Sequence, residues 1–403
     1  MKKLLSLTLT LVMMLSILII PTTAGAETLT SGDYSYEVKV DGTVTITKYN
    51  GSEEVFTIPS ILDGITVTEI GANAFAGNDS VVYVKIPDTV KKLGVNVFMN
   101  CHNLKDIVIG KNVTYIPANA FTGCSSMTSY TVPSHVTDVG VDALPYTLKS
   151  LTIGKSVNSI FDTRNSLGRY SSLAEIKVSD SNESYKSVKG VLYNKAGTTL
   201  VLYPQAKTDK SYTLSTAVTK IEKSAFENNK YLEKITFNKN LKTIESRAFY
   251  NCKKLKKVVI LKNVTKINNS AFYDCKSVNS LTIDANKNLQ IGKAVFNNLT
   301  NLKKLTAPTV AVSEMFNGCT KLNTLTIPKK VKTIAEKEFL NCPKLKTVTI
   351  PKTVKTIGKK AFGYTYDDYI GVFDKVQGFT VKGAKGSAAQ KYAKANGFKF
   401  VAI

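Results

Sequence analysis

The sequence predicts a repeat solenoid that is built mainly from short β-strands. Three observations support this: a phenylalanine that recurs every 23 residues along most of the chain, alternating apolar residues before each one, and a shared pattern around them. The pattern reads Leu-x-x-Φ-x-Φ-Pro, Val-x-x-Ile-Gly and Ala-Phe-x-x-Cys/Asn, where Φ is aliphatic or aromatic. The phenylalanines of this period are Phe75, Phe98, Phe121, Phe226, Phe249, Phe272, Phe316, Phe339 and Phe362.

Each unit contributes a short half-buried strand, because Φ-x-Φ alternates with a period of two. One unit is too small to bury its apolar face alone, so neighbouring units must stack and bury it together. Strands one unit apart should pair in parallel at ~4.8 Å. The alignment predicts about fourteen coils between residues 55 and 381, with the repeat phenylalanine, valine and isoleucine side chains stacked inside.

The repeat is interrupted at several places. Phe296 follows Phe272 by 24 residues, Phe316 follows Phe296 by only 20, and Leu144 takes the phenylalanine place after Phe121. The largest interruption, near residues 185–205, reads as a hairpin that turns near Gly197. A hairpin inserted between coils is expected to protrude, so its tip is a candidate contact loop.

The N-terminal segment, residues 27–54, is predicted to cap the solenoid. Residues 36–40 and 43–47 read as two strands joined by an Asp41-Gly42 turn. Such a hairpin would cover the open edge of the first coil.

The C-terminal segment, residues 382–403, is predicted to be a second cap. Ser387 is a candidate N-cap for a short helix with Ala388, Tyr392 and Ala395 on one face, ending at Gly397. Residues 398–401 would add a final strand.

The repeated unit resembles the leucine-rich repeats of the BspA-like bacterial surface proteins. The tail from Lys385 to Gly397 and the insertion from Gly190 to Tyr203 are similar to segments of that family. The resemblance implies a leucine-rich repeat horseshoe with a parallel β-sheet and short helical turns. It also implies a surface-exposed or secreted interaction protein, because some members are associated with adhesion to host matrix proteins. It identifies no ligand, since one repeat scaffold serves many partners.

The first 26 residues are predicted to be a secretory signal peptide. Lys2 and Lys3 precede an apolar run from Leu4 to Ile20, and Ala24-Gly25-Ala26 is a small-residue cleavage pattern. An uncleaved anchor helix is the alternative, but the run is short for a membrane span. No lipoprotein cysteine, second apolar segment or sortase-type tail follows. We therefore expect a secreted chain with no transmembrane segment after cleavage.

Charge is distributed unevenly along the chain. Residues 27–150 contain 8 basic and 13 acidic residues, a net charge of −5, whereas residues 151–403 contain 44 and 17, a net charge of +27. Only Arg164, Arg169 and Arg247 are arginines. Lysine acts as a hydrated point charge, so diffuse attraction to an anionic polymer fits better than specific nucleic-acid recognition. The alternative is that the lysines only keep a long solenoid soluble.

The outward side chains of the predicted strands form a candidate binding face, because solenoids usually bind partners on an exposed strand surface. Lys234, Lys257 and Lys304 take the same place in different coils, and like charges on paired strands repel, so a bound anion would relieve that repulsion. The threonines of this face also suit half-exposed strand positions without any binding role. The face contains Lys234, Thr236, Lys257, Val259, Ser280, Thr282, Lys304, Thr306, Thr324, Thr326, Thr347 and Thr349.

A second basic cluster is expected at the edges of the last coils. It is an alternative contact surface, and we call it the basic edge. Its members are Lys329, Lys330, Lys332, Lys352, Lys355, Lys359 and Lys360.

The six cysteines follow the repeat. Each lies three residues after the repeat phenylalanine, in a place that Asn78 and Asn229 take in other coils. An exported protein with an even number of cysteines suggests disulfides, but stacked side chains with parallel Cβ directions make a bridge strained. We therefore expect buried thiols at Cys101, Cys124, Cys252, Cys275, Cys319 and Cys342.

No catalytic or metal-binding pattern is found in the sequence. The chain has two histidines, His102 and His135, and a Cys101-His102 nucleophile pair is disfavoured because adjacent residues on a coil point apart. The cysteine spacing matches no zinc motif, and no phosphate loop or serine-nucleophile elbow occurs. We expect a protein that is not an enzyme and has no cofactor.

Two functions remain open at this stage. One is an exported binding protein, with a host matrix glycoprotein or an extracellular polymer as partner. The other is a structural cell-envelope protein held to anionic cell-wall polymers by its lysines. The sequence indicates no oligomeric state.

Overall fold

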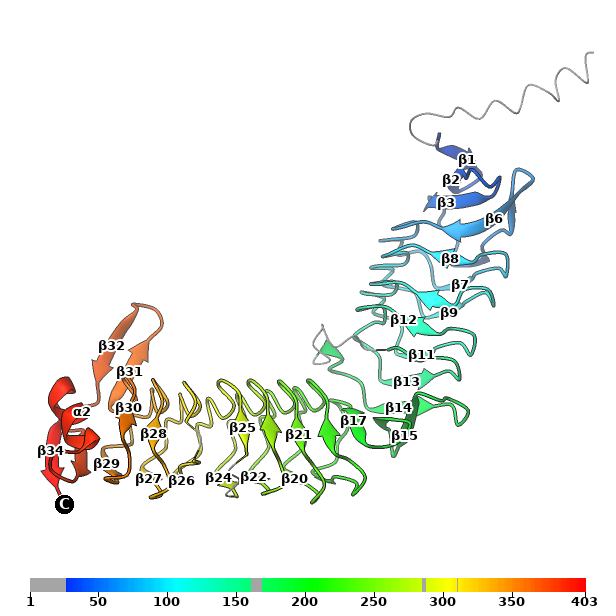
Figure 1. Cartoon of the computed structure of the whole chain (residues 1–403). Coiled ribbons are helices and arrows are strands. Elements are labelled where there is room, and N and C mark those ends of the chain that lie inside the picture. Colours follow the sequence, from blue (N-terminus) through cyan, green and yellow to red (C-terminus); the bar gives the residue numbers. More distant parts are fainter. Residues whose placement is uncertain (1–26, 161–168, 285–287, 310) are drawn as a thin grey trace, which may run out of the picture.

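The computed structural model describes residues 27–160, 169–284, 288–309 and 311–403. The predicted signal peptide lies outside these residues. The chain is a β-solenoid of about 15 turns, which confirms the predicted solenoid. Its outline is bent: an N-terminal arm and a C-terminal arm meet at the insertion near residues 185–205 (Figure 1). Each arm is nearly straight, so the curvature expected of a horseshoe is concentrated at one corner.

In the described part of the chain the predicted strands form parallel ladders of two to four strands, and within a ladder each strand pairs with its equivalent in the next coil. In β7 and β9, for example, Val84 is in register with Ile107 and both side chains point inward. We call this side of the solenoid the strand face. Its strands are β4 (Val55–Thr57), β7 (Tyr83–Lys85), β9 (Asp106–Val108), β11 (Ser129–Thr131), β13 (Ser150–Ile153), β14 (Glu175–Val178), β18 (Ser211–Thr213), β20 (Lys234–Thr236), β22 (Lys257–Ile260), β24 (Ser280–Ile283), β26 (Lys304–Thr306), β27 (Thr324–Thr326), β29 (Thr347–Ile350), β33 (Thr380–Gly383) and β34 (Lys399–Ala402).

A second series of strands, mostly two residues long, is formed by the end of the Val-x-x-Ile segment of each repeat. These strands also pair in parallel, as in the register of Ile221 with Ile244 and of Ile244 with Ile267. The sequence reasoning missed this second sheet because two residues are too few to show an alternation. Its strands are β6 (Ile65–Ile70), β8 (Lys92–Leu93), β10 (Tyr115–Ile116), β12 (Asp138–Val139), β19 (Lys220–Ile221), β21 (Thr243–Ile244), β23 (Lys266–Ile267), β25 (Gln290–Ile291), β28 (Thr333–Ile334) and β30 (Thr356–Ile357).

The repeat phenylalanines stack along the interior of both arms. Phe249 lies between Phe226 and Phe272, with ring centroids 4.6 and 4.9 Å away, and it has no exposed surface. Leu144 takes the same slot after Phe121 and is also buried. Offset aromatic stacking adds to the burial of these large side chains, so the column is a continuous part of the core.

The turn that carries each phenylalanine is closed by the residue three places later. The six cysteines are free and buried, and each thiol donates to the carbonyl of the phenylalanine in the preceding coil. Asn229 fills the same slot, and its amide donates to the carbonyls of Pro204 and Gln205. The Sγ atoms of Cys101, Cys124, Cys252, Cys275, Cys319 and Cys342 lie 3.0, 3.1, 3.1, 3.0, 3.8 and 3.5 Å from the carbonyl oxygens of Phe75, Phe98, Phe226, Phe249, Phe296 and Phe316.

These thiols should not react in the folded protein. Burial raises the pKa of Cys101 and of Cys319 to about 12, and the thiolate is the reactive form. Iodoacetamide at pH 8 is expected to label none of the six cysteines in the native chain and all six in guanidinium chloride, as counted by intact mass. Rapid native labelling, or a crosslinked Cys319–Cys342 peptide without reduction, would contradict the buried-thiol interpretation.

The insertion does not protrude, and that prediction is wrong. β15 (Tyr185–Val188), β16 (Val191–Asn194) and β17 (Thr199–Leu202) form an antiparallel unit that turns at Gly197 as predicted, but β17 then pairs in parallel with β19. Leu192 and Leu202 pack in the core of the N-terminal arm. Residues on the other face pack in the core of the C-terminal arm, namely Val191, Tyr193, Leu200 and Tyr203. The hairpin therefore joins the two cores at the corner.

The N-terminal cap forms as predicted. β2 (Tyr34–Val38) and β3 (Val44–Tyr49) are antiparallel around Gly42, and β3 pairs in parallel with β6 of the first coil. Two short strands add to this cap, β1 (Leu29–Ser31) beside β2 and β5 (Ile61–Leu62) beside β6.

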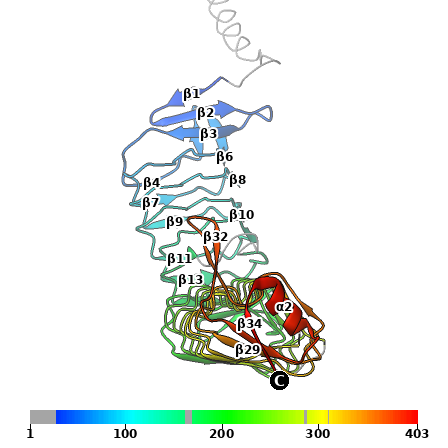
Figure 2. The ribbon, with the colours of Figure 1, turned by 90° about the vertical axis from the view of Figure 1, so that its left-hand side faces the viewer.

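The C-terminal cap also forms. Helix α2 (Ala388–Asn396) begins after Ser387 and ends at Gly397, whose φ of 65° is left-handed. It is the one α-helix in the described part of the chain, and β34 follows it and pairs with β33. Figure 2 looks along the C-terminal arm and shows α2 and β34 across its end. The buried helix residues are Ala389, Tyr392 and Ala393, so only Tyr392 of the predicted face is buried.

One buried carboxyl departs from the repeat. Glu338 takes the place that alanine holds before Phe249 and Phe272, is 2% exposed, and accepts a hydrogen bond from the Ala335 N–H at 2.7 Å. Burial raises the pKa of Glu338 to about 8, against a usual value of 4.5, although the Ala335 bond opposes the shift. The folded chain therefore holds a proton that the unfolded chain has lost, between these two pH values.

We expect Glu338 to make the protein less stable as the pH rises from about 4.5 to 8, because folding must then include binding that proton. Glu338→Gln should match the native chain near pH 4.5 and be about 2–5 kcal/mol more stable at pH 8.5. Thermal melting across this pH range measures the difference, with the exposed Glu336→Gln as the control. Equal shifts for both variants, or no pH dependence in the difference, would refute the assignment.

Candidate binding surfaces

The structure brings together two lysines of the predicted binding face. Lys234 of β20 and Lys257 of β22 are in register as direct neighbours, and both side chains are exposed. Lys257 is in register with Ser280 of β24. Lys304 starts β26, which pairs with β27, while the ladder that contains Lys234 ends at β24. Lys234 and Lys257 therefore form a pair in one ladder, and Lys304 lies in the next ladder.

The lysine pair has no carboxylate partner within the described ranges. The nearest ion pair joins Glu233 and Lys256 at 2.6 Å, next to the two lysines along the strands. Lys256, followed by Lys210 and Lys254, holds the pKa of the Glu233 carboxyl below its usual value. The surface around β20 and β22 is therefore strongly positive, and Lys234 and Lys257 are free to meet an anion.

The remaining residues of the predicted face also point outward. Val259 and Ser280 are half-buried. The other members are exposed, namely Thr236, Thr282, Thr306, Thr324, Thr326, Thr347 and Thr349.

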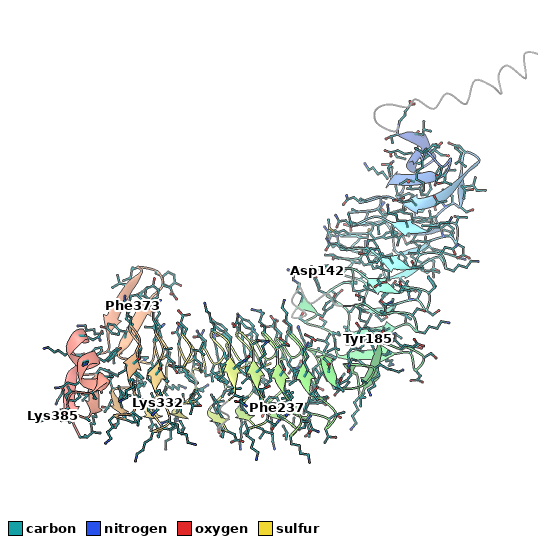
Figure 3. The ribbon with its side chains drawn as sticks, in the orientation of Figure 1. Asp142, Tyr185, Phe237, Lys332, Phe373 and Lys385 are labelled. Carbon is teal, nitrogen blue, oxygen red and sulfur yellow. The ribbon has the colours of Figure 1, made fainter. Side chains whose placement is uncertain are left out.

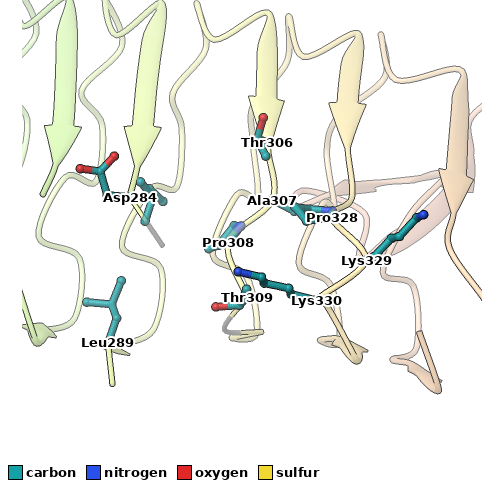
Figure 4. A pocket seen from close by; sticks show the side chains of 10 residues that line it. Asp284, Leu289, Thr306, Ala307, Pro308, Thr309, Pro328, Lys329 and Lys330 are labelled. Atoms are coloured by element: carbon teal, nitrogen blue, oxygen red, sulfur yellow. The ribbon is translucent and has the colours of Figure 1, made fainter. Parts of the chain in front are cut away.

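The basic edge divides into three groups. Lys329 and Lys330 line a pocket of about 380 Å³ beside Pro308 and Pro328 (Figure 4), and Lys352 lies at the next coil's turn. Lys332 and Lys355 precede β28 and β30, whose threonines are in register. The third group, Lys359 and Lys360, follows β30, and with Lys355 it lines a groove beside α2.

A hairpin that the sequence reasoning missed projects from the last coil. It consists of β31 (Tyr364–Asp367) and β32 (Val372–Lys375), and Figure 3 shows Phe373 on it. The Lys360 Nζ lies 3.2 Å from the centre of the Phe373 ring, a cation–π contact between the hairpin and the turn that follows β30. At the tip, Tyr369 is fully exposed and Ile370 is 68% exposed.

The length of the last unit could have revealed this hairpin. Val348 and Val381 are in register as neighbours but are 33 residues apart (381 less 348), ten more than one repeat. Alternating residues from Tyr364 onward and Gly371 at the turn are typical of a hairpin.

The Cys101-His102 pair is not assembled. Cys101 points into the core, whereas His102 is about half exposed and its Nδ1 lies 2.9 Å from Asp79 Oδ1. No group of three or more potential metal ligands lies together in residues 27–160, 169–284, 288–309 and 311–403. Over the same residues, no helix has the length and apolar character needed to cross a membrane.

The geometry defines a class of protein: a repeat solenoid whose parallel strands present an exposed face. Residues 49–186, 205–312 and 309–370 match the BspA type leucine rich repeat region, in six copies. The chain belongs to this family of leucine-rich repeat proteins.

Solved structures of similar proteins agree with the fold. A leucine-rich repeat protein from Eubacterium ventriosum is 25% identical, with a TM-score of 0.62, over 84% of this chain and 95% of that chain. The pneumococcal vaccine antigen PcpA is 22% identical, with a TM-score of 0.64, over 94% of this chain and 100% of that chain. A leucine-rich repeat protein from Bacteroides ovatus is 23% identical, with a TM-score of 0.63, over 95% and 100%. No curated protein matches the chain.

Proposed function

We propose that this chain is an exported bacterial surface or secreted protein that binds a host matrix glycoprotein or an extracellular polymer through its strand face. The observation that carries the proposal is the in-register pair of exposed lysines, Lys234 and Lys257, without a carboxylate partner among the described residues. Two like charges at neighbouring strand positions destabilise the sheet, so a bound anionic group would be favoured there.

The location outside the cell is part of the same proposal. It is supported by the predicted signal peptide, by membership of the BspA-type family, and by the likeness to a vaccine antigen. A binding scaffold without enzymatic activity is also proposed, because an exposed strand face does not exclude water from a reacting group.

A second candidate is a structural envelope protein held to anionic wall polymers by its total charge. The net charge of +27 on residues 151–403 favours it. Screening weakens attraction between exposed charges at high ionic strength, so both functions predict binding that falls with salt. They differ in the ligand, and in whether two particular lysines or the total charge is responsible for binding.

A pull-down separates the two functions. The chain from Glu27 onward is incubated with purified cell wall and with immobilised host matrix proteins, at low and at high salt. Retention of one matrix protein at low salt that is lost in Lys234→Glu/Lys257→Glu but kept in Lys239→Glu/Lys262→Glu supports specific binding through the strand face. Retention on wall alone, lost in high salt, supports the structural role, and no retention at low salt refutes both.

A further inference from the structure

We propose that the groove between helix α2 and the last complete coil binds an anionic polymer chain of the cell envelope. The groove has a volume of about 590 Å³, and Figure 2 shows α2 lying across the end of the solenoid. This inference rests on the proposed extracellular location, but it concerns a site distinct from the strand face.

Both walls of the groove carry lysines. The coil wall is β30 with its flanking residues, and it contributes Lys355, Lys359 and Lys360. The helix wall contributes Lys391 together with Ala388, Tyr392 and Ala395, a spacing that places them on one helical face. The predicted helix face therefore exists, and its role is to line the groove.

The groove is positive and contains no acidic side chain. Lys355, Lys359 and Lys391 form no ion pair with any described residue. Lys360 is held at one side by its contact with the Phe373 ring. The lysine side chains that line the groove repel one another. The low dielectric constant of the groove walls strengthens the attraction between these lysines and an anion.

The helix wall of the groove is held in place by hydrogen bonds to the neighbouring coil. The Tyr392 hydroxyl donates to the Phe362 carbonyl at 2.8 Å and accepts from the Phe362 N–H at 3.0 Å. The Asn396 side chain donates to the Tyr392 carbonyl and accepts from the Tyr364 hydroxyl at 2.8 Å. These bonds fix α2 against the coil, so binding costs little ordering of the protein.

The lining residues favour a polymer with spaced charges. Lysines bind phosphate or carboxylate groups as point charges, and no arginine is present for bidentate contact. Ile357, Ala388 and Ala395 also line the groove and suit the carbon backbone that separates the anionic groups. A glycerol-phosphate polymer and a uronic-acid polymer share this chemistry.

Isothermal titration tests the groove with glycerol-phosphate polymer, polygalacturonate and uncharged dextran, using the chain from Glu27 onward. The variant is Lys359→Glu/Lys391→Glu. The matched control is Lys344→Glu/Lys399→Glu, which changes the net charge equally at exposed lysines away from the groove. We expect the groove variant to weaken binding of one or both anionic polymers about tenfold or more at low salt, with less than about threefold loss in the control. The two polymers show whether phosphate or carboxylate is preferred.

Acetylation of lysines, read by mass spectrometry with and without polymer, provides a check that needs no variant. Protection of Lys355, Lys359 and Lys391 but not of Lys344 is expected. Equal loss in the two variants, or no binding of either anionic polymer, would overturn the assignment of the groove. Loss only in Lys234→Glu/Lys257→Glu would overturn the groove while leaving the proposed strand-face function intact.

Discussion

Replacing two leucines at the corner should unfold the N-terminal arm before the C-terminal arm. Leu192 and Leu202 are register partners in β16 and β17, are 0% and 1% exposed, and pack in the N-terminal core. Each Leu→Ala change in a core costs about 2–5 kcal/mol. Because Leu192 and Leu202 are neighbours, the two truncations would open a single shared cavity. The loss of stability in Leu192→Ala/Leu202→Ala should therefore be smaller than the sum of the two single losses, but at least about 4 kcal/mol.

Hydrogen exchange measured by mass spectrometry locates the loss. Protection should fall in β13 and β14 of the N-terminal arm and be largely retained from β20 onward, because stability in a stacked repeat is local. The control is Leu192→Met/Leu202→Met, which keeps the volume and should cost less than about 1.5 kcal/mol per site. A double alanine variant with native protection throughout would mean that the hairpin does not join the cores.

Truncating the central phenylalanine should cost about 3–5 kcal/mol. Phe249 has no exposed surface and touches three rings: Phe226, Phe272 and the edge of Phe237 at 5.8 Å. Phe249→Ala removes all three contacts and leaves a cavity that the stacked coils cannot close without shifting the strands.

Denaturant unfolding measures this loss of stability, and hydrogen exchange in the native state locates it. The largest loss of protection is expected in β20, β21 and β22. Phe249→Leu is the matched control, because Leu144 fills the equivalent slot in the other arm. It should cost roughly 1–2 kcal/mol. Equal losses in the two variants would show that the aromatic column is not the main support of these coils.

Much of the fold could be predicted from the sequence because the 23-residue repeat identifies equivalent positions in successive coils. The Phe249 column, the strand-face ladder and both caps follow from local patterns that recur many times. The corner could not be predicted in this way. Whether the 185–205 hairpin protrudes or is buried depends on which core covers Val191 and Leu192, and both faces of its strands are apolar. Apolar residues on both faces of a strand are typical of burial on both sides. This local pattern, unlike the 23-residue repeat, indicated that the hairpin is buried.

The candidate sites were predictable to a smaller extent. The spacing of Lys234 and Lys257 placed them side by side, whereas a break between β24 and β26 separates Lys304 from them. The groove beside α2 joins Lys359 to Lys391, which are 32 residues apart (391 less 359). Only the way the cap folds back on the last coil brings them together.

The central claim is that the strand-face lysines bind the partner. Measuring the affinity of two charge-reversal variants tests it most directly. The dissociation constant for the partner captured in the pull-down is measured for Lys234→Glu/Lys257→Glu and for Lys239→Glu/Lys262→Glu. The second pair is exposed and lies five residues later in the same two coils, with the same charge change. Our account predicts a loss of about tenfold or more for the first pair and less than about threefold for the second. Equal losses for the two pairs would contradict it.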